Sequence, residues 1–393
     1  DPIPFDALSG RAMQAFSEGD QWGENWHSAW FRASGAVPAE WRGKTVVARL
    51  NFGGESCIFS ESGEPLYGLT GGSIYMPHFV RDRYRLFEPC EGGESVELLV
   101  EAAANLLFGV SREQDPVPDS DFKSPAVGRL EYARLAVFDE TMHQAWLDAY
   151  FLNRLMKSLP ERDPWRAKIL VTLTTAADAF RYDDPNPDEI REILAPVMDT
   201  HASGAAIGTS AVGHAHIDTA WLWPMRETVR KTARTYATQL RMIERYPDYV
   251  FGASQAQHYQ FIKAKYPALY ERVKAAVADG RWEVQGAMWV EADCNVTSGE
   301  SLARQVLYGK KFFQDEFGVD VKNLWLPDVF GYSPCLPQLL RHAGVDTFVT
   351  QKMSWSQFNQ FPHHTFLWAG IDGSPVLAHF PPEGNYNSQL APD

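Results

Sequence analysis

The chain has 393 residues, of which 45% are hydrophobic and 22% charged, a balance typical of a globular protein with two or three domains. Its net charge of −14 argues against a nucleic-acid partner, because nucleic-acid-binding proteins neutralise phosphates with Lys and Arg. No apolar run approaches the roughly 20 residues that cross a bilayer, which argues against a membrane-spanning segment or a membrane partner.

The first part of the chain, residues 1–139, is expected to form a β-sandwich-like domain. Short runs of β-forming residues, separated by Gly-containing turns, lie at 45–50, 96–100 and 130–138. Several short strands with such turns are typical of two packed sheets. The Pro- and Asp-rich residues 115–125 are expected to form a surface loop.

Residues 140–203 are expected to form a helical connector. Their pattern is helical, and it is interrupted at Pro160, at Pro164 and across residues 183–187. Proline ends or restarts helices because it has no backbone N–H to donate.

From residue 204 to 393, strand-like apolar runs alternate with amphipathic helical stretches, which predicts an α/β fold with a parallel sheet or a parallel, (β/α) barrel-like domain. The strand-like runs are 205–212, 249–253, 282–290, 323–327, 347–350 and 376–379. Helices are expected over 229–243, from 256 to Gly280, over 300–317 and over 336–343. Polar residues at the carboxyl ends of parallel strands meet at one rim. Those expected there are His216, Asp218, Gln255, Asp293, Asp328 and Lys352.

The first motif with chemical potential is HAHID, residues 214–218, at the end of a strand-like run. Alternate residues of a strand share a face, so His214, His216 and Asp218 are expected to point the same way. An imidazole beside a carboxylate suits a divalent ion such as zinc. A polar cluster without metal is the alternative, because short metal motifs recur by chance.

Two further motifs place carboxylates after strand-like runs. Asp328 follows the run 323–327, a placement typical of catalytic carboxylates, although an Asp that caps the next helix gives the same pattern. In residues 286–295 (GAMWVEADCN), several hydrogen-bonding groups are suited to sugar hydroxyls. Asp293 is therefore a candidate substrate-binding residue.

The cysteines and the N-terminus bear on the compartment. The four cysteines, Cys57, Cys90, Cys294 and Cys335, have no metal-type pair spacing and fit reduced thiols better than a disulfide framework. The first residues lack the pattern of a signal peptide. We therefore expect a cytoplasmic protein.

Together these residues resemble glycoside hydrolase family 38, the α-mannosidases. The matching stretches, in order, are GHAHIDTAWLW, SQAQHYQFIK, WVEAD, SGESLARQ, WLPDVFGYS, LPQLL, TQKMSW and FPHHTFLWAGIDGSPVLAHFPP. They run almost continuously from about residue 204 to 387. The N-terminal region, with WHSAWF at residues 26–31, also resembles the leading β-domain of the subgroup found in bacteria and fungal vacuoles.

The resemblance implies a zinc ion bound by His216, Asp218 and Asp328, with His214 supporting the ligands from behind; cobalt tolerates the same mix of N and O ligands. It implies that Asp328 is the nucleophile. The aromatic residues that it places around the sugar are Trp221 and Phe330. A further metal ligand and the general acid are expected beyond residue 393.

The implied reaction is hydrolysis of terminal α-linked mannose from oligosaccharides with retained configuration. Asp328 attacks the anomeric carbon, a covalent mannosyl-enzyme forms, and water releases it, while zinc orients the sugar hydroxyls. Two alternatives use the same residues: a metal-dependent carbohydrate deacetylase, in which metal-bound water attacks, and a non-catalytic mannoside-binding fragment. The expected partners are α-mannoside oligosaccharides, and a homo-oligomer is compatible with the sequence.

Overall fold

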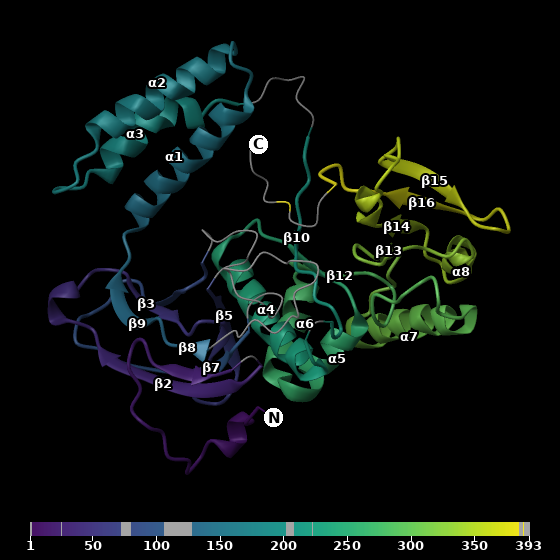
Figure 1. Ribbon diagram of the computed structural model, residues 1–393, viewed down its shortest axis with the longest axis horizontal. Coiled ribbons are helices and arrows are strands. Elements are labelled where there is room, and N and C mark those ends of the chain that lie inside the picture. The colour runs from purple at the N-terminus through teal and green to yellow at the C-terminus, as the bar shows by residue number, and fades with distance from the viewer. Residues whose placement is uncertain are drawn as a thin grey trace. The chain divides into compact units, whose positions relative to one another are not determined.

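The computed structural model describes residues 2–24, 26–71, 80–105, 128–201, 208–221, 223–384 and 388 (Figure 1). It divides into two compact units. One contains Asp1–Ala136 and Val212–Tyr386, and the other contains Val137–Ala211 and Asn387–Asp393. The loop expected at residues 115–125 lies outside the described residues. In the described part of the chain, no helix combines the length and apolar character needed to cross a bilayer.

The N-terminal region is rich in β-strands, as predicted. A four-stranded antiparallel sheet has the order β2 (Ser28–Ala36), β7 (Ser95–Ala103), β4 (Glu55–Phe59), β5 (Pro65–Thr70). A three-stranded sheet has the order β6 (Arg83–Phe87), β3 (Val46–Asn51), β9 (Tyr132–Val137). The short strands β1 (Gln21–Gly23) and β8 (Gly128–Arg129) pair with each other. The runs predicted at 45–50, 96–100 and 130–138 correspond to β3, β7 and β9.

The two larger sheets share one hydrophobic core. Every second residue of β3 and of β7 is buried in it, namely Val46, Ala48 and Leu50, and Val96, Leu98 and Val100. Alternating burial is required of a strand that has one face on a core, because successive side chains point to opposite faces.

In its described residues, the second unit contains three helices, α1 (Glu140–Ser158), α2 (Pro164–Ala179) and α3 (Pro187–Met198). The carboxylates of Asp139 and Asp163 accept hydrogen bonds from backbone N–H groups in the first turns of α1 and α2. Pro164 and Pro187 each begin a helix, where the missing N–H costs nothing. The predicted helical character and its interruptions are therefore confirmed.

The region after residue 212 is mixed α/β. A parallel sheet has the order β10 (Gly213–His214), β11 (Phe251–Ala253), β12 (Trp282–Val284). In a second sheet, β13 (Asn323–Trp325), β14 (Thr347–Val349) and β16 (Pro375–His379) are parallel, and β15 (Thr365–Ala369) pairs antiparallel with β16. The helices are α4 (Met225–Arg245), α5 (Ala256–Lys265), α6 (Pro267–Ala278), α7 (Gly299–Phe317) and α8 (Leu336–His342). The described strands form two separate sheets and close no barrel.

Several predicted elements differ from those observed. Residues 208–212 are not a strand, and β10 comes after them; residues 205–207 lie outside the described part. The helix predicted to reach Gly280 is two helices, because Pro267 begins α6. The run 282–290 stops being a strand at Val284, because Gly286 and Ala287 adopt φ values of 95° and 55°.

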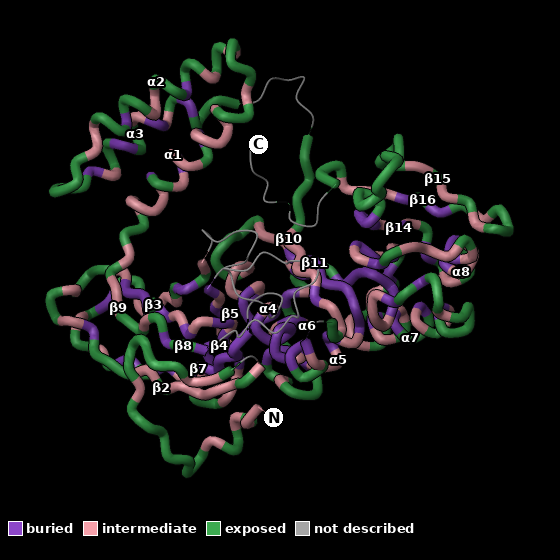
Figure 2. Tube along the Cα trace, viewed as in Figure 1, coloured by how far each residue is buried: buried purple, intermediate pink, exposed green. Residues whose placement is uncertain are grey.

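Helix α4 is buried along most of its length (Figure 2). Its inner face packs on β5, where the backbone N–H of Gly68 donates to Oγ1 of Thr238 at 2.9 Å. A side chain at Gly68 would lie 3.1 Å from Cβ of Arg234, so glycine allows this close approach of strand and helix. The N-terminal sheets and the α/β region are thus joined through α4.

Candidate metal centre and active site

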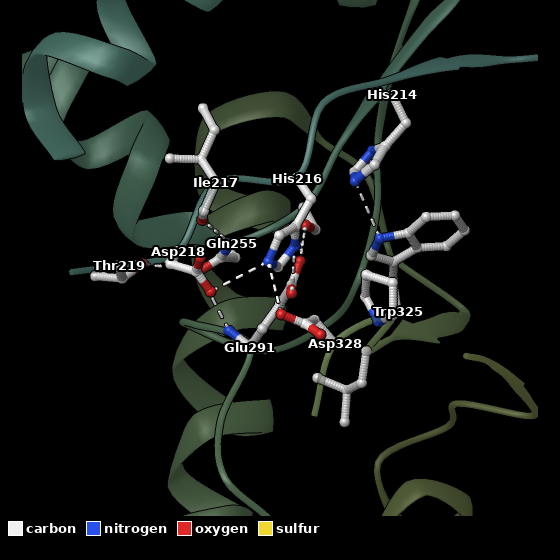
Figure 3. Close-up of polar contacts among 12 residues, drawn as sticks. His214, His216, Ile217, Asp218, Thr219, Gln255, Glu291, Trp325 and Asp328 are labelled. Atoms are coloured by element: carbon white, nitrogen blue, oxygen red, sulfur yellow. Dashed lines mark hydrogen bonds and ion pairs between the residues drawn. The ribbon is translucent and has the colours of Figure 1, made fainter. Parts of the chain in front are cut away.

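Loops that follow the parallel strands bring polar side chains together (Figure 3). His216 and Asp218 lie between β10 and α4, Glu291 follows β12, and Asp328 follows β13. Lys352 begins a short 3-10 helix, η3 (Lys352–Trp355), after β14. The first three residues follow strands of one sheet and the last two follow strands of the other, in each case at the carboxyl ends, where α/β proteins place their ligands.

His216, Asp218 and Asp328 form a compact group of nitrogen and oxygen atoms. Nε2 of His216 lies 3.2 Å from Oδ1 of Asp218 and 3.6 Å from Oδ2 of Asp328. One potential ligand atom from each residue lies within 4.8 Å of the others. The three side chains are 24%, 27% and 26% exposed, so the group is open to solvent without lying on the free surface. Figure 3 shows both carboxylates directed toward the imidazole.

Glu291 lies on the other side of the imidazole. Its Oε2 is 3.0 Å from Nδ1 of His216, and its Oε1 accepts a hydrogen bond from Oγ of Ser254 at 2.9 Å. Burial by itself lowers the pKa of His216, but Glu291 and Asp218 outweigh it and raise that pKa well above its ordinary value. The surroundings of the ring therefore favour positive charge.

Gln255 joins the β10–α4 loop to the loop after β12. Its side chain donates to the carbonyl of Ile217 at 2.8 Å and accepts from Oγ1 of Thr219 at 2.8 Å and from the backbone N–H of Glu291 at 3.3 Å. Its φ of 66° is unusual for a residue other than glycine, and such backbone strain persists only where surrounding contacts enforce it. The amide therefore fixes the spacing between the two loops.

Lys352 lies against Asp328 and between two aromatic rings. Its ammonium donates a hydrogen bond to Oδ1 of Asp328. The same nitrogen is 3.9 Å from the ring centre of Phe330 and 3.6 Å from that of Trp355, and the two rings are stacked at 6.5 Å. The cation–π contacts direct the ammonium toward the carboxylate. One oxygen of Asp328 thus faces Lys352, and the other faces His216.

The two parts of the chain match different domain models. Residues 206–393 match the N-terminal domain of glycosyl hydrolases family 38, and residues 1–136 match the α-mannosidase jelly roll domain. The chain belongs to glycoside hydrolase family 38.

Curated relatives of this family 38 chain are similar over nearly all of its length. α-Mannosidase 2C1 of Homo sapiens is 37% identical over 391 residues, covering 98% of this chain and 36% of the relative. α-Mannosidase G of Dictyostelium discoideum is 38% identical, with coverage of 94% and 34%. An α-mannosidase of Saccharomyces cerevisiae is 32% identical, with coverage of 93% and 34%. The chain spans about a third of the length of these relatives.

His214 of the family 38 chain does not share the orientation of His216 and Asp218. Strand β10 ends at His214, so the alternation expected from a strand does not continue beyond it. Its Nδ1 lies 2.9 Å from the carbonyl oxygen of Gly252, and its Nε2 accepts from the indole N–H of Trp325 at 3.2 Å. Burial lowers its pKa, in keeping with a neutral ring. The contact with Trp325 connects it to the strand that leads to Asp328.

The three expected sugar-binding residues lie in different surroundings. Trp221 and Phe330 are 50% and 71% exposed, so each offers apolar ring surface to solvent. The carboxylate of Asp293 accepts hydrogen bonds from the backbone N–H groups of Asn295 and Val296 at 3.0 and 2.8 Å. Asp293 therefore stabilises its own turn.

Sequence reasoning assigned no role to Glu291 or Lys352. Glu291 stands two positions before Asp293 in the WVEAD motif, and the structure brings it, instead of Asp293, to His216. Lys352 was expected at the rim but without a chemical role. The sequence feature that could have indicated a role is a lysine placed shortly after an apolar strand. Such a buried cation requires a carboxylate partner, which is Asp328.

Proposed function

We propose that this chain forms the nucleophile- and metal-binding part of a retaining α-mannosidase that removes terminal α-linked mannose from oligosaccharides. The observation that carries the proposal is the convergence of His216, Asp218 and Asp328, whose ligand atoms lie within 4.8 Å of one another. Membership of family 38 and similarity to proteins named α-mannosidases supply the substrate class.

The donor set fits a divalent ion such as Zn²⁺, with Co²⁺ as the alternative. One imidazole and two carboxylates are ligands that zinc accepts. Nδ1 of His216 faces Glu291 at 3.0 Å, so a proton on Nδ1 leaves the lone pair of Nε2 directed at the two carboxylates. A bound ion would polarise and orient sugar hydroxyls. Support of the ligands by His214, through Trp325, is part of this proposal.

Asp328 acts as the nucleophile in the proposed reaction. One carboxylate oxygen of Asp328 forms a bond to the anomeric carbon as the bond between that carbon and the leaving oxygen breaks. The leaving oxygen takes up a proton from a general acid. Water then attacks the anomeric carbon, gives a proton to the deprotonated general acid and so restores it, and the bond to Asp328 breaks, which gives net retention. Lys352 restricts the rotation of the carboxylate through its hydrogen bond to Oδ1.

The sugar would lie against exposed aromatic rings. Trp221 and Phe330 present apolar ring surface of the kind that packs on the C–H face of a sugar. The carboxylate of Asp293 would make a weaker contact with the substrate, because it already accepts two backbone hydrogen bonds. We further propose that the two sheets that follow residue 212 belong to one (β/α) barrel-like domain over residues 204–393, after a β-sandwich-like domain over 1–139 and a helical connector over 140–203.

The compartment and assembly are also proposals. The four cysteines form no disulfide among the described residues, which fits a cytoplasmic protein. A homo-oligomer is compatible with the fold.

Trapping with a 2-fluoro mannoside bearing a good leaving group tests the mechanism. A retaining mannosidase gives a covalent adduct, and peptide mass spectrometry should locate it on Asp328. A metal-dependent deacetylase would give no sugar adduct, because metal-bound water attacks there. The experiment uses this chain and a version extended at the C-terminus to the length of its relatives. An adduct on another carboxylate would refute the assignment of Asp328. The absence of any adduct in both proteins would refute it as well.

A further inference from the structure

Helix α4 carries buried cations that face carboxylates of the N-terminal sheet. Nε of Arg230 lies 3.1 Å from Oε2 of Glu101 on β7. Nη2 of Arg234 lies 3.1 Å from Oε2 of Glu55 on β4, and Lys231 forms an ion pair with the same oxygen. The three cationic side chains are each only 7% exposed. The helix and the sheet are therefore joined by charges that water hardly reaches.

The charges within this cluster balance. Glu227, one turn before Arg230 on α4, pairs with Nη1 of Arg230 at 2.9 Å and with Nη2 of Arg234 at 2.6 Å. Together with Glu55 and Glu101, Glu227 supplies a third carboxylate, which equals the number of cations in the cluster. The side-chain amide of Asn105 donates to Glu55 at 3.0 Å. Buried ion pairs contribute little net stability compared with apolar packing, but they fix which groups meet, since a misplaced partner leaves a charge unpaired.

The first turns of α4 also contact the loop that carries His216 and Asp218. Oγ1 of Thr228, next to Glu227, donates to the carbonyl of Asp218 at 3.1 Å. The same oxygen accepts from the backbone N–H of Ala220 at 2.9 Å and from the indole N–H of Trp223 at 3.0 Å. Thr228 is fully buried, so these bonds meet little competition from water.

Lys231 connects the loop with the sheet. Its ammonium pairs with Glu55 of β4 and also lies 4.7 Å from the ring centre of Trp223 in the loop. A continuous set of contacts thus runs from Glu55 through Lys231 and Trp223 to Thr228, and from there to the backbone of Asp218.

We infer that the N-terminal β-domain positions the metal centre: the charge cluster seats α4 on the sheet, and Thr228 transmits that position to Asp218. Glu55, Lys231 and Thr228 are positioning residues in this scheme, and none of them contacts the ion. The inference rests on the proposed function, because it presupposes that His216, Asp218 and Asp328 bind a divalent cation. It gives the jelly roll domain a part in ligand geometry.

The test is Co²⁺ binding to the full chain by titration calorimetry, with thermal unfolding of the metal-free protein measured in parallel. Glu55→Gln keeps the shape of the side chain and removes its charge. We expect it to weaken Co²⁺ binding by about tenfold, a loss at the low end of those seen when supporting residues of metal sites are changed. The matched control is Glu97→Gln, a carboxylate of the same sheet that forms an exposed pair with Arg32. It should leave the affinity unchanged.

A second variant, Thr228→Val, removes the hydroxyl at nearly constant volume, and Thr228→Ser should restore binding. If Glu55 and Thr228 act through the same chain of contacts, their effects are not independent. The fold-loss of Co²⁺ affinity in the double variant Glu55→Gln/Thr228→Val should then be smaller than the product of the two single fold-losses. A lower unfolding temperature with unchanged affinity, or losses that multiply, would overturn the inference. If Glu55→Gln does not fold, the inference is tested by the Co²⁺ affinities of Thr228→Val and Thr228→Ser. Equal affinities of these two variants would refute it. Absence of Co²⁺ binding both by the unaltered chain and by the version extended at the C-terminus would instead remove the proposed metal centre, and the inference with it.

Discussion

Lys352 donates a hydrogen bond to Oδ1 of Asp328, while Oδ2 of the same carboxylate lies 3.6 Å from Nε2 of His216. The two oxygens of the proposed nucleophile therefore have different partners. A carboxylate fixed in this way cannot rotate freely about its last bond, so the oxygen that faces His216 and the oxygen that faces Lys352 keep their places. Ordering of this kind before substrate binds lowers the cost of reaching the transition state.

In the version extended at the C-terminus, replacement of Lys352 by Met should lower kcat/KM on nitrophenyl α-mannoside by about 10- to 100-fold. This is the range expected when a charge-assisted hydrogen bond to a reacting group is lost. The affinity for Co²⁺ should change much less, because Lys352 is not a proposed ligand. Lys311→Met is the control, since Lys311 pairs with Asp315 on the exposed side of α7. Unchanged kcat/KM in Lys352→Met would mean that the lysine does not orient Asp328.

Replacement of Glu291 by Gln should weaken metal binding by about 10- to 100-fold, as is typical for residues that orient a metal-binding histidine. The neutral amide would attract a proton on Nδ1 of His216 less strongly than the carboxylate, whose Oε2 lies 3.0 Å from that nitrogen. The matched variant is Asp293→Asn, two positions along the same loop, where the carboxylate stabilises a turn. Titration calorimetry should separate the two variants, and equal losses of affinity would count against a specific role of Glu291.

Much of this site could be predicted because its residues directly follow apolar runs. His216, Asp218 and Asp328 each lie a few residues after the carboxyl end of a short parallel strand, which is where α/β proteins place their ligands. The first two follow β10 and the third follows β13 of another sheet, so their meeting point itself comes from the fold. The choice between Glu291 and Asp293 could not be predicted. The two residues are two positions apart, so an uninterrupted strand would place both side chains on one face. Strand β12 ends at Val284 and the chain turns at Gly286 and Ala287, and only the folded loop shows that Glu291 is the residue that faces His216.

The inner face of α4 shows a second limit of sequence patterns. Helical periodicity identified the helix and apolar positions such as Ala233, Tyr236 and Leu240, which are buried. The same reasoning places Arg230 and Arg234 in solvent, because charged residues are rarely buried without a partner. Their partners come partly from Glu55 and Glu101, which are more than a hundred positions away in the sequence. Only the fold brings these charges together.

The stability of the chain should depend on pH through Glu55. Burial raises the pKa of this carboxyl, but Lys231 and Arg234 outweigh burial and lower the pKa from 4.5 to about 2. A carboxyl with a depressed pKa in the folded state stabilises that state above its unfolded pKa, and the contribution is lost as pH falls from about 4.5 toward 2. The shift corresponds to roughly 3 kcal/mol of unfolding free energy at neutral pH.

Urea unfolding of the unaltered chain and of Glu55→Gln, at neutral pH and at steps down to about pH 3, measures this contribution. The difference in unfolding free energy should be largest at neutral pH and should shrink below about pH 4.5. Glu97→Gln, from the exposed pair, should show a small difference that varies little with pH. A difference for Glu55→Gln that stays constant with pH would show that Glu55 is not held ionised by its partners.

Gly309 should be intolerant of alanine although it lies in the middle of α7. Alanine favours helix by about 1 kcal/mol over glycine, so an exposed site would gain stability. A Cβ at position 309, however, would lie 2.8 Å from Cα of Met288 and would overlap the backbone of Ala287. Backbone atoms cannot move aside as a flexible side chain does. We therefore expect Gly309→Ala to lose about 1–3 kcal/mol of unfolding free energy, the usual cost of overpacking.

Gly299→Ala is the matched control, because it lies at the first position of the same helix and a Cβ there meets nothing within 4 Å. Its unfolding free energy should stay the same or rise by up to about 1 kcal/mol. The backbone of Met288 leads directly to Glu291, so Gly309→Ala should also weaken Co²⁺ binding, which Gly299→Ala should not. Equal stability of the two variants would show that α7 does not approach the loop after β12 as closely as described, and the support of His216 from that loop would then need another source.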